Sequence, residues 1–123
     1  QVAENHTVYE YTIFFDDEQA RRLLYPVLKN VSYTRWHPYF LDIVPEGLSK
    51  SYGAARILER IGVTREECMA FGDGGNDESM LRAAGVGVAM GNALDSVKAH
   101  ADYVTTDVDN DGVWNALKHF GII

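Results

Sequence analysis

The sequence predicts an α/β protein in two parts, a small α+β unit over residues 1–44 and a doubly wound parallel sheet over residues 45–123. Two observations predict this division. Strand-like and helix-like segments follow one another as strand, helix, strand, strand in the first part, whereas helices and strands alternate regularly in the second. At the start of the second part, residues 45–47 (PEG) interrupt the pattern with a proline and a glycine.

The first part opens with residues 7–15 (TVYEYTIFF), whose β-branched and aromatic side chains predict a strand. A helix is expected over residues 17–29, because alanine, leucine and valine recur there along one face. Two further strands are predicted over residues 31–36 and 39–44, with a turn at residues 37–38.

The second part begins with a predicted helix over residues 50–61, which Ser49 caps at its start and Gly62 ends. Two short apolar runs, residues 68–71 (CMAF) and 86–90 (VGVAM), predict strands buried on both faces, as in a parallel sheet. Helices are also predicted over residues 77–84, 93–99 and 112–119, with a strand at residues 102–105.

Charge and composition argue against several kinds of partner. The 123 residues include 11 Lys and Arg against 18 Asp and Glu, which gives a net charge of −7. Nucleic-acid and anionic-membrane binders normally carry the opposite charge or a basic stripe, so neither partner is expected. No apolar run approaches the roughly 20 residues that span a bilayer. The single cysteine, Cys68, excludes an internal disulfide and suits a reducing compartment, so a cytoplasmic location is expected.

The densest chemical signal is the segment 72–77 (GDGGND), which lies between a predicted buried strand and the start of a helix. Open α/β sheets bind ligands at this end of their strands. Asp73 and Asp77 supply hard oxygen ligands suited to magnesium, and Asn76 with the helix start offers donors to a phosphate. The alternative is an acidic, glycine-rich solvated turn in which Asn76 caps the helix. A dinucleotide fingerprint is excluded, because Asp77 stands where that motif needs its last glycine.

A second candidate is Lys50, at the start of the predicted helix over residues 50–61. A lysine at this end does not favour the helix dipole, so a functional role is one explanation of its position. In that role, its ammonium group balances the charge of a phosphate and a carboxylate. The alternative is a solvated lysine on the surface.

The segment 107–112 (DVDNDG) imitates the opening of a calcium-binding loop. An EF-hand needs a bidentate glutamate where this sequence has Lys118, so that interpretation is excluded. Asp111 is instead expected to cap the last helix.

Several segments in combination resemble the haloacid dehalogenase (HAD) superfamily and, more narrowly, its Cof-type sugar-phosphate phosphatases. The resemblance is strong over about residues 40–123, whereas residues 1–39 resemble more loosely the closing strands of that family's cap domain. It implies a HAD-like, Rossmann-type parallel sheet, which is the C-terminal part of the core, preceded by the closing α+β part of a cap. The segments are 47–50 (GLSK), 72–77 (GDGGND), 87–93 (GVAMGNA), 101–105 (ADYVT) and 111–113 (DGV).

The resemblance assigns roles to four residues. Lys50 matches the lysine that binds the transferring phosphoryl group, and Asn76 matches the amide that contacts the substrate phosphate. Asp73 matches the acid that ligates Mg²⁺, and Asp77 matches the second acid of that motif, which supports the metal or Lys50. Catalytic roles for Lys50 and Asp77 and a metal site at Asp73 and Asp77 are therefore implied. In the implied reaction an aspartate attacks a phosphomonoester, and water then hydrolyses the aspartyl-phosphate.

One departure from the family pattern is decisive. The family's first motif, DxDGT, carries the nucleophile, and neither Asp16 with Asp17 nor residues 107–109 are followed by Gly-Thr. The second motif is also missing, and the sequence begins at Gln1 like the middle of a chain. A C-terminal fragment that is inactive alone is therefore expected.

These observations predict part of a magnesium-dependent phosphatase acting on a small phosphomonoester, with sugar phosphates as the expected class. The alternatives are a non-catalytic HAD-like binding module and a phosphomutase of the same superfamily. The fragment is expected to associate with a missing N-terminal half, or with itself through an exposed sheet edge.

Overall fold

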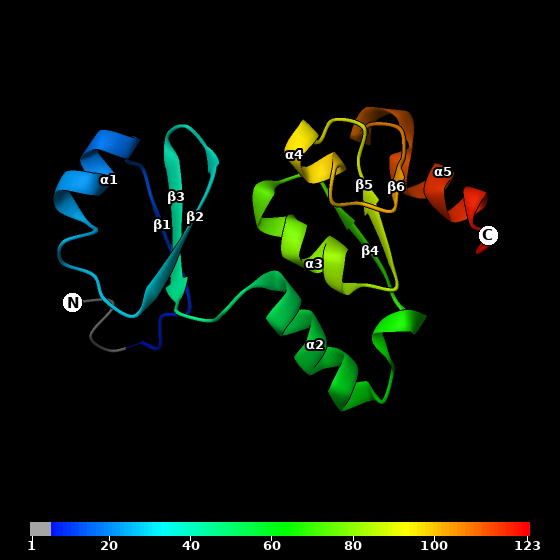
Figure 1. Ribbon diagram of the computed structural model, residues 1–123, viewed down its shortest axis with the longest axis horizontal. Coiled ribbons are helices and arrows are strands. Elements are labelled where there is room, and N and C mark those ends of the chain that lie inside the picture. The colour runs from blue at the N-terminus through cyan, green and yellow to red at the C-terminus, as the bar shows by residue number, and fades with distance from the viewer. Residues whose placement is uncertain (1–5) are drawn as a thin grey trace. The chain divides into compact units, whose positions relative to one another are not determined.

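The computed structural model describes residues 6–123, apart from the side chain of Trp36, and divides into two compact units. The first unit ends at Leu48, and the second is Ser49–Ile123 (Figure 1). Residues 1–5, with which the predicted first part begins, lie outside the described residues.

The first unit contains a three-stranded antiparallel sheet in the order β1-β3-β2, together with one helix. Ile43 of the central strand lies opposite Tyr11 on one neighbour and Tyr33 on the other. Ile43 is buried together with Ala20 and Leu41, and these three residues form the core of the unit. The elements are β1 (Tyr11–Ile13), α1 (Asp17–Leu23), β2 (Val31–His37) and β3 (Phe40–Pro45).

Helix α1 begins as its sequence predicts but ends well before residue 29. The Asp16 carboxylate accepts a hydrogen bond from the Gln19 N–H (2.8 Å), and the Gln19 side chain accepts one from the Asp16 N–H (3.2 Å). The helix ends at Leu23 because Pro26 has no N–H to donate and disfavours helical backbone at the residue before it. The predicted strand over residues 7–15 is also shortened, since only Tyr11–Ile13 pairs with β3.

The second unit is a three-stranded parallel sheet in the order β4-β5-β6, which confirms the predicted α/β class. Met69 of β4 lies opposite Val86 of β5, and Val88 of β5 lies opposite Tyr103 of β6. Figure 1 shows α3 and α5 on opposite sides of these strands. The elements are α2 (Lys50–Ile61), β4 (Met69–Gly72), α3 (Glu78–Ala83), β5 (Val86–Ala89), α4 (Asp95–Lys98), β6 (Tyr103–Val104) and α5 (Gly112–His119).

Helix α2 has the two ends that the sequence predicts. The Ser49 Oγ accepts a hydrogen bond from the Tyr52 N–H (3.1 Å), and Gly62 ends the helix in the left-handed conformation (φ 71°). Leu81, Ala89, Ala93 and Val97 form a buried cluster that holds α3 and α4 against β5. These contacts fix the loops that follow β4 and β5.

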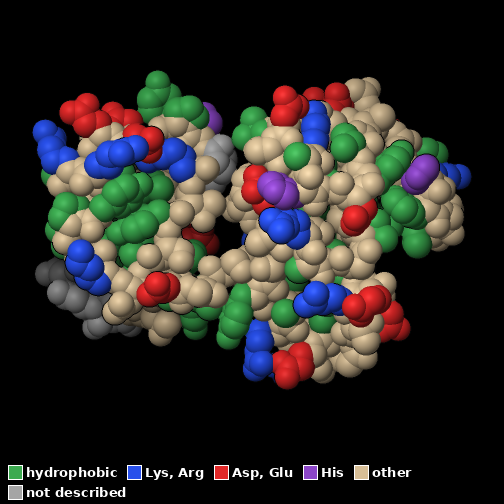
Figure 2. Space-filling view, viewed as in Figure 1, with side chains coloured by type: hydrophobic (Ala, Val, Ile, Leu, Met, Phe, Trp, Pro, Cys, Tyr) green, Lys and Arg blue, Asp and Glu red, His purple; other side chains and the backbone are tan. Residues whose placement is uncertain are grey.

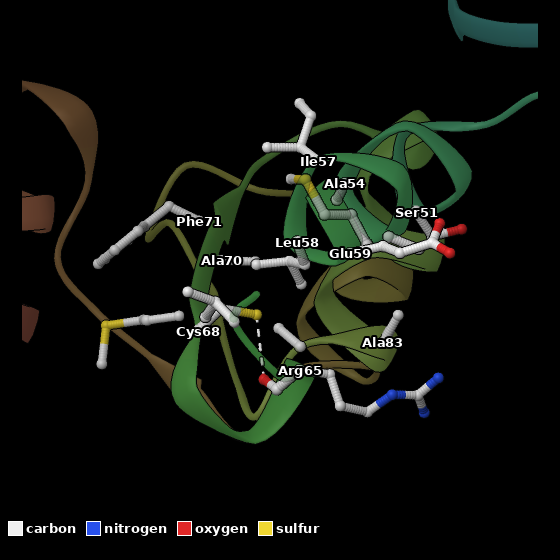
Figure 3. A pocket seen from close by; sticks show the side chains of 15 residues that line it. Ser51, Ala54, Ile57, Leu58, Glu59, Arg65, Cys68, Ala70, Phe71 and Ala83 are labelled. Atoms are coloured by element: carbon white, nitrogen blue, oxygen red, sulfur yellow. Dashed lines mark hydrogen bonds between the residues drawn. The ribbon is translucent and has the colours of Figure 1, made fainter. Parts of the chain in front are cut away.

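Strand β4 is paired on one side only within residues 6–123. The Val86 and Met90 N–H groups donate to the carbonyls of Cys68 and Gly72, at 3.2 and 2.9 Å. Alternate residues of a strand bond to the same neighbour, so the backbone groups of Met69 and Phe71 face the other edge. Next to β4, an apolar hollow of about 580 Å³ lies between α2, β4 and α3 (Figure 3).

Charged side chains of both signs occur on each unit in the face shown in Figure 2. In the first unit, Arg35 forms an ion pair with Asp17, with 2.8 Å between Nε and Oδ1. The Nη1 of Arg35 also donates a hydrogen bond to the carbonyl of Phe15 (2.9 Å). Among the described residues, no helix combines the length and the apolar character needed to cross a membrane.

Candidate active site

The candidate site is the loop between β4 and α3, at the carboxyl end of β4, and it lies within the second unit. A short 3₁₀ turn, Gly75–Asp77, reverses the chain before α3 begins. The reversal brings Asp77 back against the end of β4. A Cβ added at Gly72 would lie 2.4 Å from the Cβ of Asp77, so this close approach requires glycine.

The buried carboxylate of Asp77 is the centre of this loop. Its Oδ2 accepts hydrogen bonds from the backbone N–H groups of Asp73 and Gly74, each at 3.0 Å. Its Oδ1 accepts from the Nζ of Lys50 at the start of α2. The side chain of Asp77 is 7% exposed and that of Lys50 is 48% exposed, so the lysine is much the more accessible partner of this pair.

The surroundings of Asp77 stabilise its ionised form. Burial by itself would raise the pKa of Asp77, but the hydrogen bond from Lys50 and those from the N–H groups of Gly74 and Asp73 lower it further than burial raises it. The pKa of Asp77 therefore lies below its ordinary value. An ionised Asp77 holds the side chain of Lys50 in place through this ion pair.

Asp73 and Asn76 have few partners and are accessible from the loop. The exposed carboxylate of Asp73 accepts one hydrogen bond, at Oδ2, from the Nδ2 of Asn92 (3.0 Å). Within residues 6–123, Oδ1 of Asp73 and the side-chain amide of Asn76 make no hydrogen bond. These groups are the ones that remain available to a bound ligand.

The structure thus brings the four predicted residues to one loop and the adjoining helix start, with Lys50 and Asp77 in direct contact. Within the described part of the chain, no three Asp, Glu, His or Cys side chains form a cluster that could hold a metal ion. Asp73 and Asp77 therefore contribute at most part of a coordination shell.

Asn92 is a residue of this site that the sequence did not single out. It lies in the loop after β5, as Asp73 lies in the loop after β4, and neighbouring parallel strands end at the same edge of a sheet. A polar side chain in the loop after a predicted parallel strand was the sequence feature that could have identified Asn92. The apolar hollow beside β4, by contrast, is lined by none of the four predicted residues (Figure 3).

The prediction for Asp111 is wrong in part. Asp111 does occupy the position before α5, but its backbone is left-handed (φ 54°) and its side chain makes no capping hydrogen bond. The left-handed backbone ends the preceding turn, Val108–Asn110, in place of the extended conformation that a side-chain cap uses.

Comparisons with known proteins agree with this fold and loop. The family of haloacid dehalogenase-like hydrolases matches residues 1–117. The putative phosphatase YkrA of Bacillus subtilis is 37% identical over 120 residues, which are 98% of this chain and 46% of YkrA. A B. subtilis 5-amino-6-(5-phospho-D-ribitylamino)uracil phosphatase, YcsE, is 38% identical over 95% of this chain and 49% of its own length. The chain therefore belongs to the haloacid dehalogenase-like hydrolases.

The chain is also similar to solved structures of haloacid dehalogenase phosphatases. The HAD subclass IIB sugar phosphatase BT4131 is 47% identical, with a TM-score of 0.88 over 99% of this chain and 46% of BT4131. The phosphatase BT1666 of Bacteroides thetaiotaomicron is 46% identical, with a TM-score of 0.89 over 99% of this chain and 45% of its own. One of these structural neighbours is thus a HAD subclass IIB sugar phosphatase, and the other is a phosphatase of the HAD superfamily. The present chain spans about half the length of the relatives and structures it matches.

Proposed function

We propose that this chain supplies the phosphate-binding half of the active site of a phosphatase that acts on small phosphorylated metabolites, with sugar phosphates as the class. The observation that carries the proposal is the contact between Lys50 and Asp77 in a loop that also presents Asn76. The names of the relatives, which include a sugar phosphatase and a phosphatase of a phosphorylated ribitylaminouracil, support this class.

Lys50 is the residue that we assign to the transferring phosphoryl group. Its side chain is about half exposed, and the ionised Asp77 holds the ammonium group in one position. A positive charge fixed in this way stabilises the negative charge on a phosphoryl group during transfer. The free amide of Asn76 donates to a second phosphate oxygen. Asp77 acts through Lys50 and is therefore a positioning residue.

Asp73 is the residue that fits a divalent cation. Its carboxylate is exposed, and its Oδ1 has no partner among the described residues. Mg²⁺ is typically held by one or two carboxylates together with substrate oxygens and water, so one protein ligand from this loop is sufficient. The two oxygens of Asp77 already accept three hydrogen bonds, so at most one lone-pair site, on Oδ1, is left for a metal. Bound Mg²⁺ would supply further positive charge to the transferring group.

The nucleophile is absent from the 123 residues, since no DxDGT segment occurs in them. We propose that it comes from a further part of the protein, equivalent to the half of the relatives that this chain does not match. The attacking group would be an aspartate, which would displace the alcohol of the phosphomonoester and form an aspartyl-phosphate that water then hydrolyses. The unpaired edge of β4 and the apolar hollow beside it are the surface that we assign to this part.

The experiment compares Lys50→Met with Arg60→Met in the protein as it is naturally produced. Both changes remove a cation from α2, but Arg60 is exposed in the last turn, away from the loop. Release of inorganic phosphate from a panel of sugar phosphates is expected to fall about 100-fold or more in kcat for Lys50→Met, and to stay unchanged for Arg60→Met. Equal rates for the two variants would contradict the assignment. Movement of the phosphate to another position of the substrate, detected by ³¹P NMR, would identify a phosphomutase. The absence of turnover with every substrate tested would favour a non-catalytic binding module.

A further inference from the structure

Asn92 joins the exposed carboxylate of Asp73 to a second loop. Its Nδ2 donates to Asp73 Oδ2, and its Oδ1 accepts from the backbone N–H of Val108, both at 3.0 Å. A carboxylate oxygen only accepts and a backbone N–H only donates, so the two ends of the amide are not interchangeable. The side chain of Asn92 is therefore held in a single orientation by partners that lie 19 and 16 residues away in the sequence.

The loop that contains Val108 is itself firmly braced. Thr106 Oγ1 donates to the carbonyl of Asn110 (2.7 Å), and Asn115 Nδ2 donates to both Thr106 Oγ1 and that carbonyl, at 2.8 and 2.9 Å. A Cβ added at Gly112 would lie 2.2 Å from the carbonyl oxygen of Thr106, so the chain is tightly packed there. The N–H of Val108 is consequently a fixed point, and Asn92 transmits that fixed position to Asp73.

We infer that Asn92 is a positioning residue that orients the carboxylate of Asp73 for binding a divalent cation, an inference that rests on the proposed role of Asp73. No other side chain among residues 6–123 bonds to that carboxylate, which is exposed and would otherwise rotate freely. The bond from Asn92 occupies Oδ2 and leaves Oδ1 for the cation. Hydrogen bonds that hold a metal ligand from behind typically change metal affinity by about 10- to 100-fold.

Asn115 provides a matched control. It braces the same loop through Thr106 and Asn110 but makes no contact with Asp73. If Asn92 only stabilised the loop, Asn92→Ala and Asn115→Ala would have the same effects. If Asn92 orients Asp73, only Asn92→Ala weakens cation binding.

The test measures the dissociation constant of Mg²⁺ by calorimetry, without substrate, in the naturally produced protein. Asn92→Ala is expected to raise this constant about tenfold, while Asn115→Ala leaves it unchanged and lowers only the melting temperature. In kinetics, Asn92→Ala is expected to raise the Mg²⁺ concentration for half-maximal rate and to recover most of kcat at saturation. Equal Mg²⁺ affinity in the two variants would overturn the inference.

Asp73→Asn separates this inference from the proposed function. If Asp73→Asn binds Mg²⁺ as well as the unchanged protein, the metal role of Asp73 itself is wrong. If Asp73→Asn loses binding and Asn92→Ala does not, only the role of Asn92 is wrong. A measurement on the unchanged protein avoids the risk that a variant misfolds. In ¹⁵N spectra, Mg²⁺ is expected to shift the side-chain amide signals of Asn92 and not those of Asn115. Equal shifts of both signals, or no shift of either, would overturn the inference.

Discussion

Lys50 and Asp77 are separated by 27 residues of sequence, and the ammonium of one contacts the carboxylate of the other. A lysine in the first turn of a helix faces the positive end of the helix dipole, which is unfavourable by itself. The buried carboxylate of Asp77 compensates for this unfavourable interaction. It also accepts hydrogen bonds from two backbone N–H groups of its own loop. One ion pair thus fixes the start of α2 and the shape of the loop together.

Replacing Asp77 is expected to lower stability in a pH-dependent way. Asp77→Asn keeps the shape but removes either the bond to Lys50 or the two backbone bonds, at a cost of about 2 kcal/mol in the free energy of unfolding near neutral pH. The folded-state pKa of Asp77 is lowered, so its contribution is complete above the ordinary carboxyl pKa of about 4 and is lost as the pH falls through the lowered value. Urea denaturation of both proteins across this pH range checks it. A difference that does not shrink in acid would contradict the assignment.

Gly72 and Gly75 form a matched pair of glycines in the loop. An alanine Cβ at Gly72 would lie 2.4 Å from the Cβ of Asp77, whereas one at Gly75 would meet nothing within 4 Å. Gly72→Ala is therefore expected to lower the free energy of unfolding by about 2 kcal/mol, and Gly75→Ala by much less. Thermal unfolding of the two variants measures the difference, and similar melting temperatures would mean that the loop is free to shift.

Excess magnesium is expected to distinguish Asp73 from Lys50. Asp73→Asn removes the charge that attracts the cation, so raising the Mg²⁺ concentration in the naturally produced protein restores part of its phosphatase activity. Lys50→Ala removes the positive charge that is proposed to contact the phosphoryl group, so added Mg²⁺ is not expected to restore the rate. Steady-state rates over a magnesium series test the two roles. Equal rescue of both variants, or of neither, would argue against them.

The 123 residues alone are expected not to hydrolyse p-nitrophenyl phosphate with Mg²⁺, because the sequence contains no DxDGT segment to form an aspartyl-phosphate. Phosphate release from the purified 123-residue chain is the measurement. Sustained turnover that Asp73→Ala abolishes would show that this chain carries a nucleophile of its own.

The unpaired edge of β4 is expected to make the isolated 123 residues associate, either with each other or with the rest of the protein. Ile57→Glu should reduce this association without unfolding, since Ile57 lines the hollow beside β4 and is 62% exposed. Ile61 is equally exposed on the same helix but does not line the hollow, so Ile61→Glu is the control. Light scattering measures the mass. A cooperatively unfolding monomer of 13.7 kDa would contradict the expectation.

The sequence was most informative where local chemistry decides the structure. Ser49 and Gly62 mark the ends of α2 because a side-chain cap and a left-handed residue act within one turn. The end of α1 was predicted too late, because the apolar stripe continues past Pro26 although the helix does not. Asn92 was not singled out at all, since its contact with Asp73 depends on two strands lying side by side.

Asp73 and Asp77 are four residues apart in the loop and differ in burial and in the number of hydrogen bonds that they accept. Asp77 is buried with three bonds from the protein, whereas Asp73 is exposed with one. Maintenance of the fold therefore favours Asp77 and Gly72, whereas the proposed binding of a cation is the main reason to keep Asp73. A descendant of this protein that had given up catalysis would be expected to keep the first pair and lose Asp73. The residue at position 73 would then distinguish active enzymes from inactive relatives with the same fold.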